Sequence, residues 1–241
     1  MGVDDAEAAT DDELFQRALF EVSTEETDDD RLPALEALQD RPTSHVFERA
    51  VRLLAHESPD ERELGARILR ELGPDDGTGH RPFTTKTIKA IVAEMPDEPD
   101  PWVLGWMISA LGYHNAQEAL DLVLSYQAHT AQPVRFSVAA ALPALADQEH
   151  TEARVVEALL TLSEDENDSV RWYALYALFN ETVGITDAQK TAWANTLTER
   201  GSTERRAELR KIATTLDDHA DSTLRNALEQ AYGLGEHRYS G

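Results

Sequence analysis

The residues best suited to binding in this chain are aromatic side chains gathered in two short segments. Their spacing is helical: Trp102, Trp106 and Tyr113 lie in one segment, and Trp172, Tyr173 and Tyr176 in the other. Two interpretations stay open. The rings pack against a neighbouring helix, or some of them remain partly exposed and anchor a protein interface, for which Trp and Tyr are well suited.

Metal binding is not indicated by the sequence. The eight His residues form no HExxH or HxH pattern. The acidic runs 28–30 and 164–166 lack the Asp-x-Asp-x-Asp-Gly spacing and distal Glu of a calcium-binding EF-hand loop. We therefore expect no metal site and no cofactor.

Catalytic motifs are also missing. The chain has no Cys, which excludes disulfides, thiolate catalysis and Cys-ligated metals. It contains no GxxxxGK[ST], GxGxxG or GxSxG motif. Pairs of carboxylates carry no information where 46 of 241 residues are Asp or Glu. The prediction is a protein without catalytic residues.

The charge balance excludes some partners and favours others. Against 46 acidic residues stand 22 Lys and Arg, which gives a formal net charge of −24. Such a field repels a nucleic-acid backbone and attracts a basic protein. No apolar run reaches the ~20 residues of a membrane span, and the acidic N-terminus does not resemble a signal peptide. We expect a cytoplasmic protein with no membrane contact.

Helical periodicity runs through the chain, so the aromatic side chains named above fall on predicted helices. Apolar stripes recur at helical spacing, and short breaks rich in Asp, Pro, Gly and Thr separate them. Proline falls near three predicted helix starts, at Pro59, Pro101 and Pro133. Beyond a cap helix at 14–22, the predicted helices include 31–39, 44–55, 83–94, 116–128, 151–162, 187–199 and 221–232.

Five segments align with one another, and they begin at Glu61, Val103, Val134, Val170 and Arg205. The fifth position is often small, as at Gly65, which allows neighbouring helices to approach closely. The second position is Arg in four of the segments: Arg62, Arg135, Arg171 and Arg206. We expect these arginines to form structural ion pairs between repeats, with Asp168 both capping its helix and pairing with Arg171.

The segments SPDERELGARILRELGP, QPVRFSVAAALPALAD and VRWYALYALFNE carry a resemblance to a known family. They resemble HEAT repeats, in particular the short bacterial HEAT-like repeats of the phycobilisome-lyase type. The segment at 102–114 departs from the pattern, since Leu104 stands where Arg is usual. The resemblance implies an all-α, right-handed α-α superhelical solenoid of about six helix pairs.

The resemblance also bears on domain organisation and on function. We expect an acidic N-terminal segment at 1–29, a solenoid at 30–232 and a polar tail at 233–241. The favoured function is a non-catalytic scaffold for protein–protein interaction, with no settled oligomeric state. Its partner-binding candidates are the aromatic residues Trp102, Trp106, Tyr126, Trp172, Tyr173, Tyr176 and Trp193.

Two alternatives remain open. The first is an acidic inhibitor or immunity-type protein that blocks a basic target. The second is an enzyme, because HEAT-like repeats also occur in bilin lyases and in alkylpurine DNA glycosylases; the net charge of −24 disfavours the glycosylase.

Overall fold

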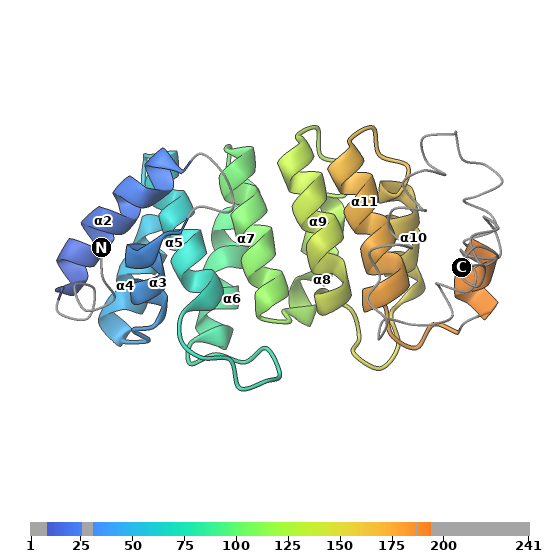
Figure 1. The fold of residues 1–241 in the computed structure, drawn as a ribbon, viewed down its shortest axis with the longest axis horizontal. Coiled ribbons are helices and arrows are strands. Elements are labelled where there is room, and N and C mark those ends of the chain that lie inside the picture. The colour runs from blue at the N-terminus through green and yellow to red at the C-terminus, as the bar shows by residue number, and fades with distance from the viewer. Residues whose placement is uncertain (1–8, 26–30, 187, 194–241) are drawn as a thin grey trace, which may run out of the picture. The chain divides into compact units, whose positions relative to one another are not determined.

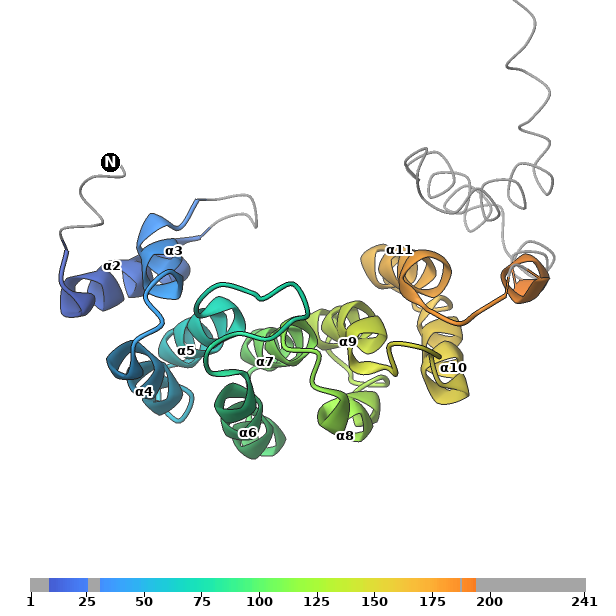
Figure 2. The same cartoon turned by 90° about the horizontal axis from the view of Figure 1, so that it is seen from below.

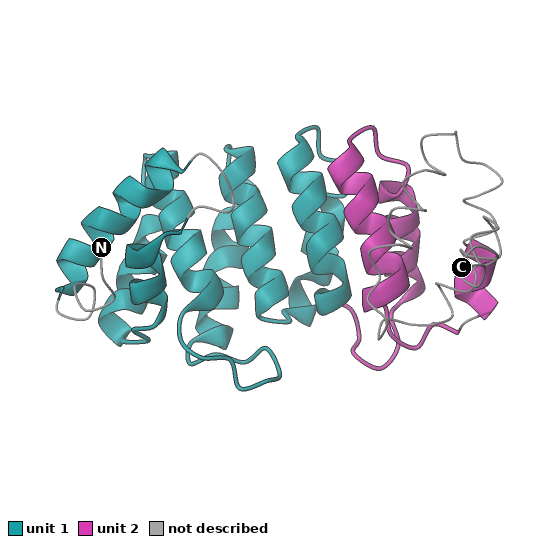
Figure 3. Ribbon diagram, viewed as in Figure 1, with its two compact units in different colours: residues 1–145 teal, residues 146–241 magenta. Residues whose placement is uncertain are grey.

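A computed structural model describes residues 9–25, 31–186 and 188–193 (Figure 1). Within these residues the regular structure is helical and no strand occurs, so the prediction of an all-α helical-repeat fold is confirmed. The chain divides into two compact units, residues 1–145 and 146–241 (Figure 3).

The first unit opens with two helices that cover the start of its repeats. These are α2 (Asp11–Thr24) and α3 (Pro33–Gln39), which pack on each other and on α5. Thr10 and Glu13 form a capping box at the start of α2. The Glu21 carboxylate accepts hydrogen bonds from the backbone N–H groups of Ala34 and Leu35 at 3.0–3.1 Å. One acidic side chain of α2 thus supplies the N-terminal cap that α3 lacks locally.

Three helix pairs complete the first unit and form two rows (Figure 2). One row contains α4 (Ser44–Leu53), α6 (Thr84–Glu94) and α8 (Leu120–Ser125). The other contains α5 (Pro59–Glu71), α7 (Pro101–Tyr113) and α9 (Gln132–Leu145), with α7 packed between its two neighbours. The short 3₁₀ helices η1 (Met95–Asp97) and η2 (Gln117–Ala119) lie in the connections.

Glycines set the closeness of two helix contacts. A Cβ added at Gly65 of α5 would lie 2.8 Å from the Ala50 carbonyl oxygen and 2.9 Å from the Leu53 Cβ of α4. On α7, a Cβ at Gly105 would meet only the Ser137 hydroxyl closely, at 3.0 Å. The contact at Gly65 involves backbone that cannot move aside, whereas the Ser137 side chain can rotate.

Contacts at both ends of α5 and α7 hold these helices parallel and in register. Near their starts, Arg62 donates to the Glu98 carboxylate at 2.8 and 2.9 Å. Near their ends, buried His114 lies with Nε2 2.9 Å from the Leu69 carbonyl oxygen and Nδ1 2.9 Å from the Thr84 hydroxyl. Because a carbonyl oxygen only accepts, Nε2 carries a proton. Burial lowers the pKa of the imidazole, which favours the neutral form in which Nδ1 accepts from the Thr84 hydroxyl.

The second unit, as far as it is described, contains one further helix pair. It consists of α10 (Ala153–Leu162) and α11 (Asp168–Tyr176), and α11 continues into a π-helical turn, η3 (Ala177–Glu181). The cap prediction for α11 was wrong by one residue. Asn167 is the N-cap and accepts from the N–H groups of Ser169 and Val170, while Asp168 is the first helical residue.

The predicted helix positions agree with the structure except in length. The segment 116–128 holds only the short helices η2 and α8, which follow one another directly and end at Ser125. Helical residues occur at 188–193, within the predicted helix 187–199. The rest of that helix, the helix 221–232 and the aligned segment from Arg205 lie outside the described residues.

Gly65→Ala tests the close contact between α4 and α5. Alanine favours a helix by about 1 kcal/mol over glycine. The clash with Ala50 and Leu53 should outweigh this gain and lower the free energy of unfolding by about 1–3 kcal/mol. Gly105→Ala is the matched control and should change it by less than about 1 kcal/mol, since only the Ser137 hydroxyl must move. Equal effects of the two variants in urea denaturation would contradict this account.

His114 should make stability depend on pH. Burial lowers the pKa of its imidazole, so the unfolded chain takes up a proton at a higher pH than the folded chain does. Stability from this group is therefore complete above pH ~6.5 and is lost as the pH falls towards the folded pKa, by at most about 1.4 kcal/mol per pH unit. Denaturation between about pH 7.5 and pH 5.5 should show a smaller loss in His114→Gln than in the wild type. Parallel curves for the two proteins would disprove the assignment.

Candidate functional site

Helix α7 is buried on every side except for one stripe. Eight of its residues are buried, and the exposed or half-exposed positions from Trp102 onward are Trp102, Trp106, Ser109 and Tyr113. Trp102 is 60% exposed and Tyr113 is 42% exposed. Their spacing places all four on one face, which extends for roughly 16 Å along the helix axis. We call Trp102, Trp106 and Tyr113 the aromatic face.

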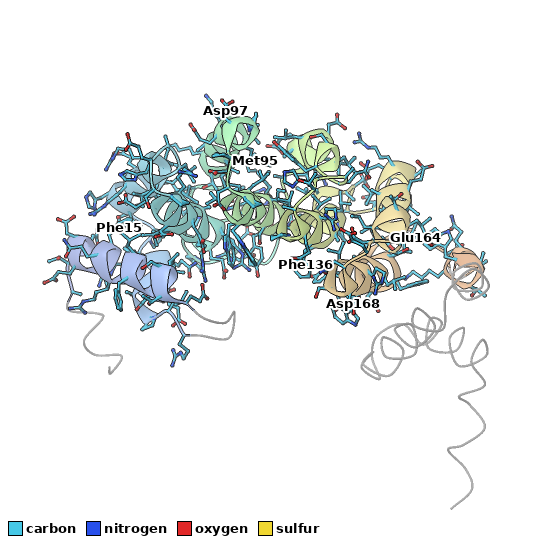
Figure 4. The ribbon with its side chains drawn as sticks, turned by 90° about the horizontal axis from the view of Figure 1, so that it is seen from above. Phe15, Met95, Asp97, Phe136, Glu164 and Asp168 are labelled. Carbon is cyan, nitrogen blue, oxygen red and sulfur yellow. The ribbon has the colours of Figure 1, made fainter. Side chains whose placement is uncertain are left out.

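Phe136 on α9 is a half-exposed ring on the same row of helices. Figure 4 shows it on the side of α9 that is turned away from α8. Neither α7 nor α9 contains an acidic residue, although acids are frequent elsewhere in the chain. These two helices therefore bring rings, but no carboxylate, to this side of the row.

Two arginines of α5 hold rings of the aromatic face in place. The Arg67 guanidinium lies 4.3 Å from the centre of the Trp106 ring. The Arg70 guanidinium lies 3.7 Å from the centre of the Tyr113 ring and 5.4 Å from that of Trp106. These cation–π contacts fix the rings before any partner binds, so little side-chain entropy remains to be lost on binding.

The charge of Arg67 is balanced by carboxylates. Arg67 forms ion pairs with Glu25, at the end of α2, and with Glu63, one turn earlier on α5, the latter at 3.1 Å. The three side chains are between 9% and 20% exposed. Burial raises the pKa of the Glu63 carboxyl, and the nearby charges of Glu25 and Asp60 raise it further, against the opposing effect of Arg67. Two carboxylates thus share one guanidinium beside the aromatic face.

The second unit has its own ring cluster on α11. The Trp172 and Tyr176 rings are stacked with centres 5.4 Å apart and planes within 7°. Tyr173 meets Trp172 edge-on at 6.0 Å and Tyr176 at 5.8 Å. All three rings are half-exposed. Figure 4 shows Asp168, one turn before Trp172, on the side of α11 turned away from α10.

The recurring arginines share one geometry. Each donates from Nη1 to the carbonyl oxygens six and five residues earlier, in the loop before its helix. The distances are 2.8–3.0 Å for Arg62 with His56 and Glu57, Arg135 with His129 and Thr130, and Arg171 with Asp165 and Glu166. Carbonyl groups left over where the preceding helix ends thereby find a donor within the same repeat.

Arg62 and Arg171 form ion pairs of different kinds. Arg62 does join two repeats, because Glu98 lies in the loop before α7, the helix that carries Leu104 in place of Arg. Asp168 pairs with Arg171 at 2.5 Å, but residues three apart on one helix are neighbours on its surface. This pair therefore stabilises the first turn of α11 and connects no repeats. Arg206 lies outside the described residues.

Two other predicted partner-binding residues are not part of the aromatic face. Tyr126 follows α8, in the other row, and its hydroxyl donates to the Met95 carbonyl oxygen at 3.3 Å. Burial raises the pKa of the Tyr126 phenol. Trp193 is half-exposed in the second unit. Their roles in partner binding remain predictions.

Sequence reasoning did not single out Glu25, Glu63, Arg67 or Arg70 as parts of the site. Arg67 and Arg70 stand at positions that carry no Arg in the other aligned segments, so the repeat pattern gives no signal for them. Their spacing of three residues on one helix face was the available clue. Glu25 is distant in the sequence and reaches Arg67 only through the fold.

The described part of the chain contains neither a cluster of metal ligands nor a membrane-spanning helix. No group of three or more potential metal ligands comes together among these residues. Among the helices of that part, none has both the length and the apolar character required to cross a bilayer.

A family model for HEAT repeats matches residues 88–178, from within α6 to the beginning of η3. The predicted resemblance to HEAT repeats is confirmed for this part of the chain. No curated protein matches the chain.

Three solved structures are similar to this chain. The X-ray structure of E. coli YibA matches with a TM-score of 0.58 and 14% identity, over 95% of this chain and 72% of YibA. An engineered protein matches with a TM-score of 0.43 and 18% identity, over 92% of this chain and 97% of its own. The complex of CpcE and CpcF of phycocyanin lyase from Nostoc sp. PCC7120 matches with a TM-score of 0.43 and 19% identity, over 92% and 82%. The YibA match shows the fold alone.

Arg62→Ala tests the link between α5 and the loop before α7. The Glu98 side chain is only 2% exposed, so removal of Arg62 leaves a carboxylate buried without its cation. We expect the free energy of unfolding to fall by about 3 kcal/mol in urea denaturation. The control is Arg31→Ala, whose pair with Glu36 is 80% and 52% exposed and should contribute less than about 1 kcal/mol. A loss no larger than that of the control would show that the pair is not structural.

Proposed function

We propose that this HEAT-like repeat protein is a non-catalytic scaffold that binds a protein partner on its aromatic face. One observation carries the proposal: α7 is covered on all sides except for a stripe bearing Trp102, Trp106 and Tyr113. Trp, Tyr and Arg are the residues that contribute most to protein-binding energy, and here they occur together in one stacked set.

The mechanism would be rigid recognition. The rings sit on helices rather than loops, and Arg67 and Arg70 fix two of them. A partner would lose little free energy to ordering the surface it meets. Carboxylates next to the face would draw a basic partner towards it, and the exposed rings would supply the short-range contact. We also propose that the protein is located in the cytoplasm.

The acidic inhibitor is a second candidate, and one specific observation favours it. The local excess of carboxylates around Arg67 adds to a net charge of −24, as expected of a protein that blocks a basic surface. An inhibitor of this kind would bind with an affinity that falls steeply as salt is added, whereas a scaffold that relies mainly on its rings would lose less.

A capture experiment tests the scaffold. The tagged wild type, a Trp102→Ser/Tyr113→Ser double variant and a Phe20→Ser control would be exposed to extract of the source organism, and the bound proteins identified by mass spectrometry. Phe20 is 68% exposed on α2 and lies outside the aromatic face. A protein held by the wild type and the control should be reduced about tenfold or more in the double variant.

Thermal unfolding would verify that all three proteins are folded, which is expected because the altered rings are exposed. Capture of the same proteins in the same amounts by the double variant would refute binding at this face.

A further inference from the structure

The rings of α7 already bind guanidinium groups within the chain. Arg67 covers Trp106, and Arg70 lies over Tyr113 and beside Trp106. Cations and rings therefore alternate along the contact between α5 and α7. This arrangement shows which chemical group the face accepts.

At Trp102 the alternation stops. Trp102 lies four residues before Trp106 on α7, and Glu63 lies four residues before Arg67 on α5. Because the two helices run parallel and in register, the same step along both leads from the Arg67–Trp106 contact to Glu63 and Trp102. Trp102 is 60% exposed, and no cation of the described residues lies over its ring.

The charges around Trp102 favour the binding of a cation. Arg67 forms ion pairs with both Glu25 and Glu63. Asp60, exposed and one turn before Glu63, adds a further negative charge. Glu25, Glu63 and Asp60 thus carry more negative charge than Arg67 balances. A second cation would relieve this excess.

We propose that Trp102, Glu63 and Asp60 form a receptor for an arginine side chain of a basic partner segment. The guanidinium would lie over the open Trp102 ring and donate to the carboxylates, so extending the Arg–Trp–Arg–Tyr series by one member. Arginine fits better than lysine, because its planar group stacks on a ring and binds a carboxylate through two N–H groups at once. This inference rests on the proposed function and names the chemistry of the partner.

Peptide titration tests the proposal directly. The probes are a short peptide of alternating arginine and glycine, the same peptide with lysine, and the same peptide with uncharged citrulline. Binding to the full chain would be followed by NMR through the indole N–H signal of Trp102, assigned with Trp102→Phe. The arginine peptide should shift this signal, the lysine peptide should bind more weakly, and the citrulline peptide should not bind.

Variants localise the effect. Trp102→Ala and Glu63→Gln should each weaken binding of the arginine peptide about fivefold or more, which corresponds to one cation–π contact or one charge-assisted hydrogen bond. Phe20→Ala should leave the affinity unchanged, since Phe20 is an exposed ring that forms no cation–π contact with a described residue and belongs to neither the ring series nor the carboxylate cluster. Circular dichroism of each variant would establish that it is folded.

Equal binding of the arginine and citrulline peptides, or an unchanged affinity in Trp102→Ala, would overturn the proposal. Equal binding of the arginine and lysine peptides would overturn its preference for guanidinium. If these results occurred while protein capture still depended on Trp102 and Tyr113, the scaffold function would stand and only the arginine receptor would fall.

Discussion

The parallel register of α5 and α7 is the constraint on which the functional face depends. Arg62 and Glu98 fix it near the helix starts, and His114 fixes it near the ends through the Leu69 carbonyl group. A shift of one residue in this register would rotate each facing side chain by about 100° around its helix. Arg67 and Arg70 would then no longer meet Trp106 and Tyr113, and the rings would lose their support.

The same region carries charge at a cost. Burial of the Arg67, Glu25 and Glu63 side chains removes one positive and two negative charges from water. The positive charge balances only one of the two negative charges. Apolar residues at these positions would stabilise the fold at least as well. The pattern is easier to explain if the charges serve recognition, because a preformed guanidinium contact and a nearby excess of carboxylate together define a binding preference that apolar packing cannot provide.

The repeat architecture could be predicted from sequence because its signals are local. Pro59 and Pro101 mark helix starts, and Asp100 caps α7 through the N–H groups of Trp102 and Val103. The role of Arg62 was foreseen only in outline, since the loop carbonyl groups that it binds belong to no residue-type pattern. In the run Glu166–Asn167–Asp168–Ser169 three residues are good caps, and sequence alone does not choose among them.

The site was harder to predict because it depends on contacts between distant segments. The spacing of Trp102, Trp106 and Tyr113 indicates one helix face, but whether that face meets solvent depends on how α5 and α9 cover the rest of α7. Glu25 meets Arg67 only after α2 folds back onto α5. The π-helical turn at 177–181 likewise depends on hydrogen bonds that the residue pattern ALFNE does not predict.

The acidic residues are unevenly distributed along the chain, and this distribution distinguishes a surface that serves solubility from one that serves binding. Asp and Glu make up 46 of 241 residues, yet α7 and α9 contain none. Burial explains most of this, because a carboxylate between packed helices would lose its hydration. It does not explain the open stripe of α7, where a charged side chain at Trp102 or Tyr113 would remain in water and improve solubility. Large rings at those exposed positions expose apolar area to water, and a surface that retains them beside dense negative charge is suited to a partner that offers both apolar contact and positive charge.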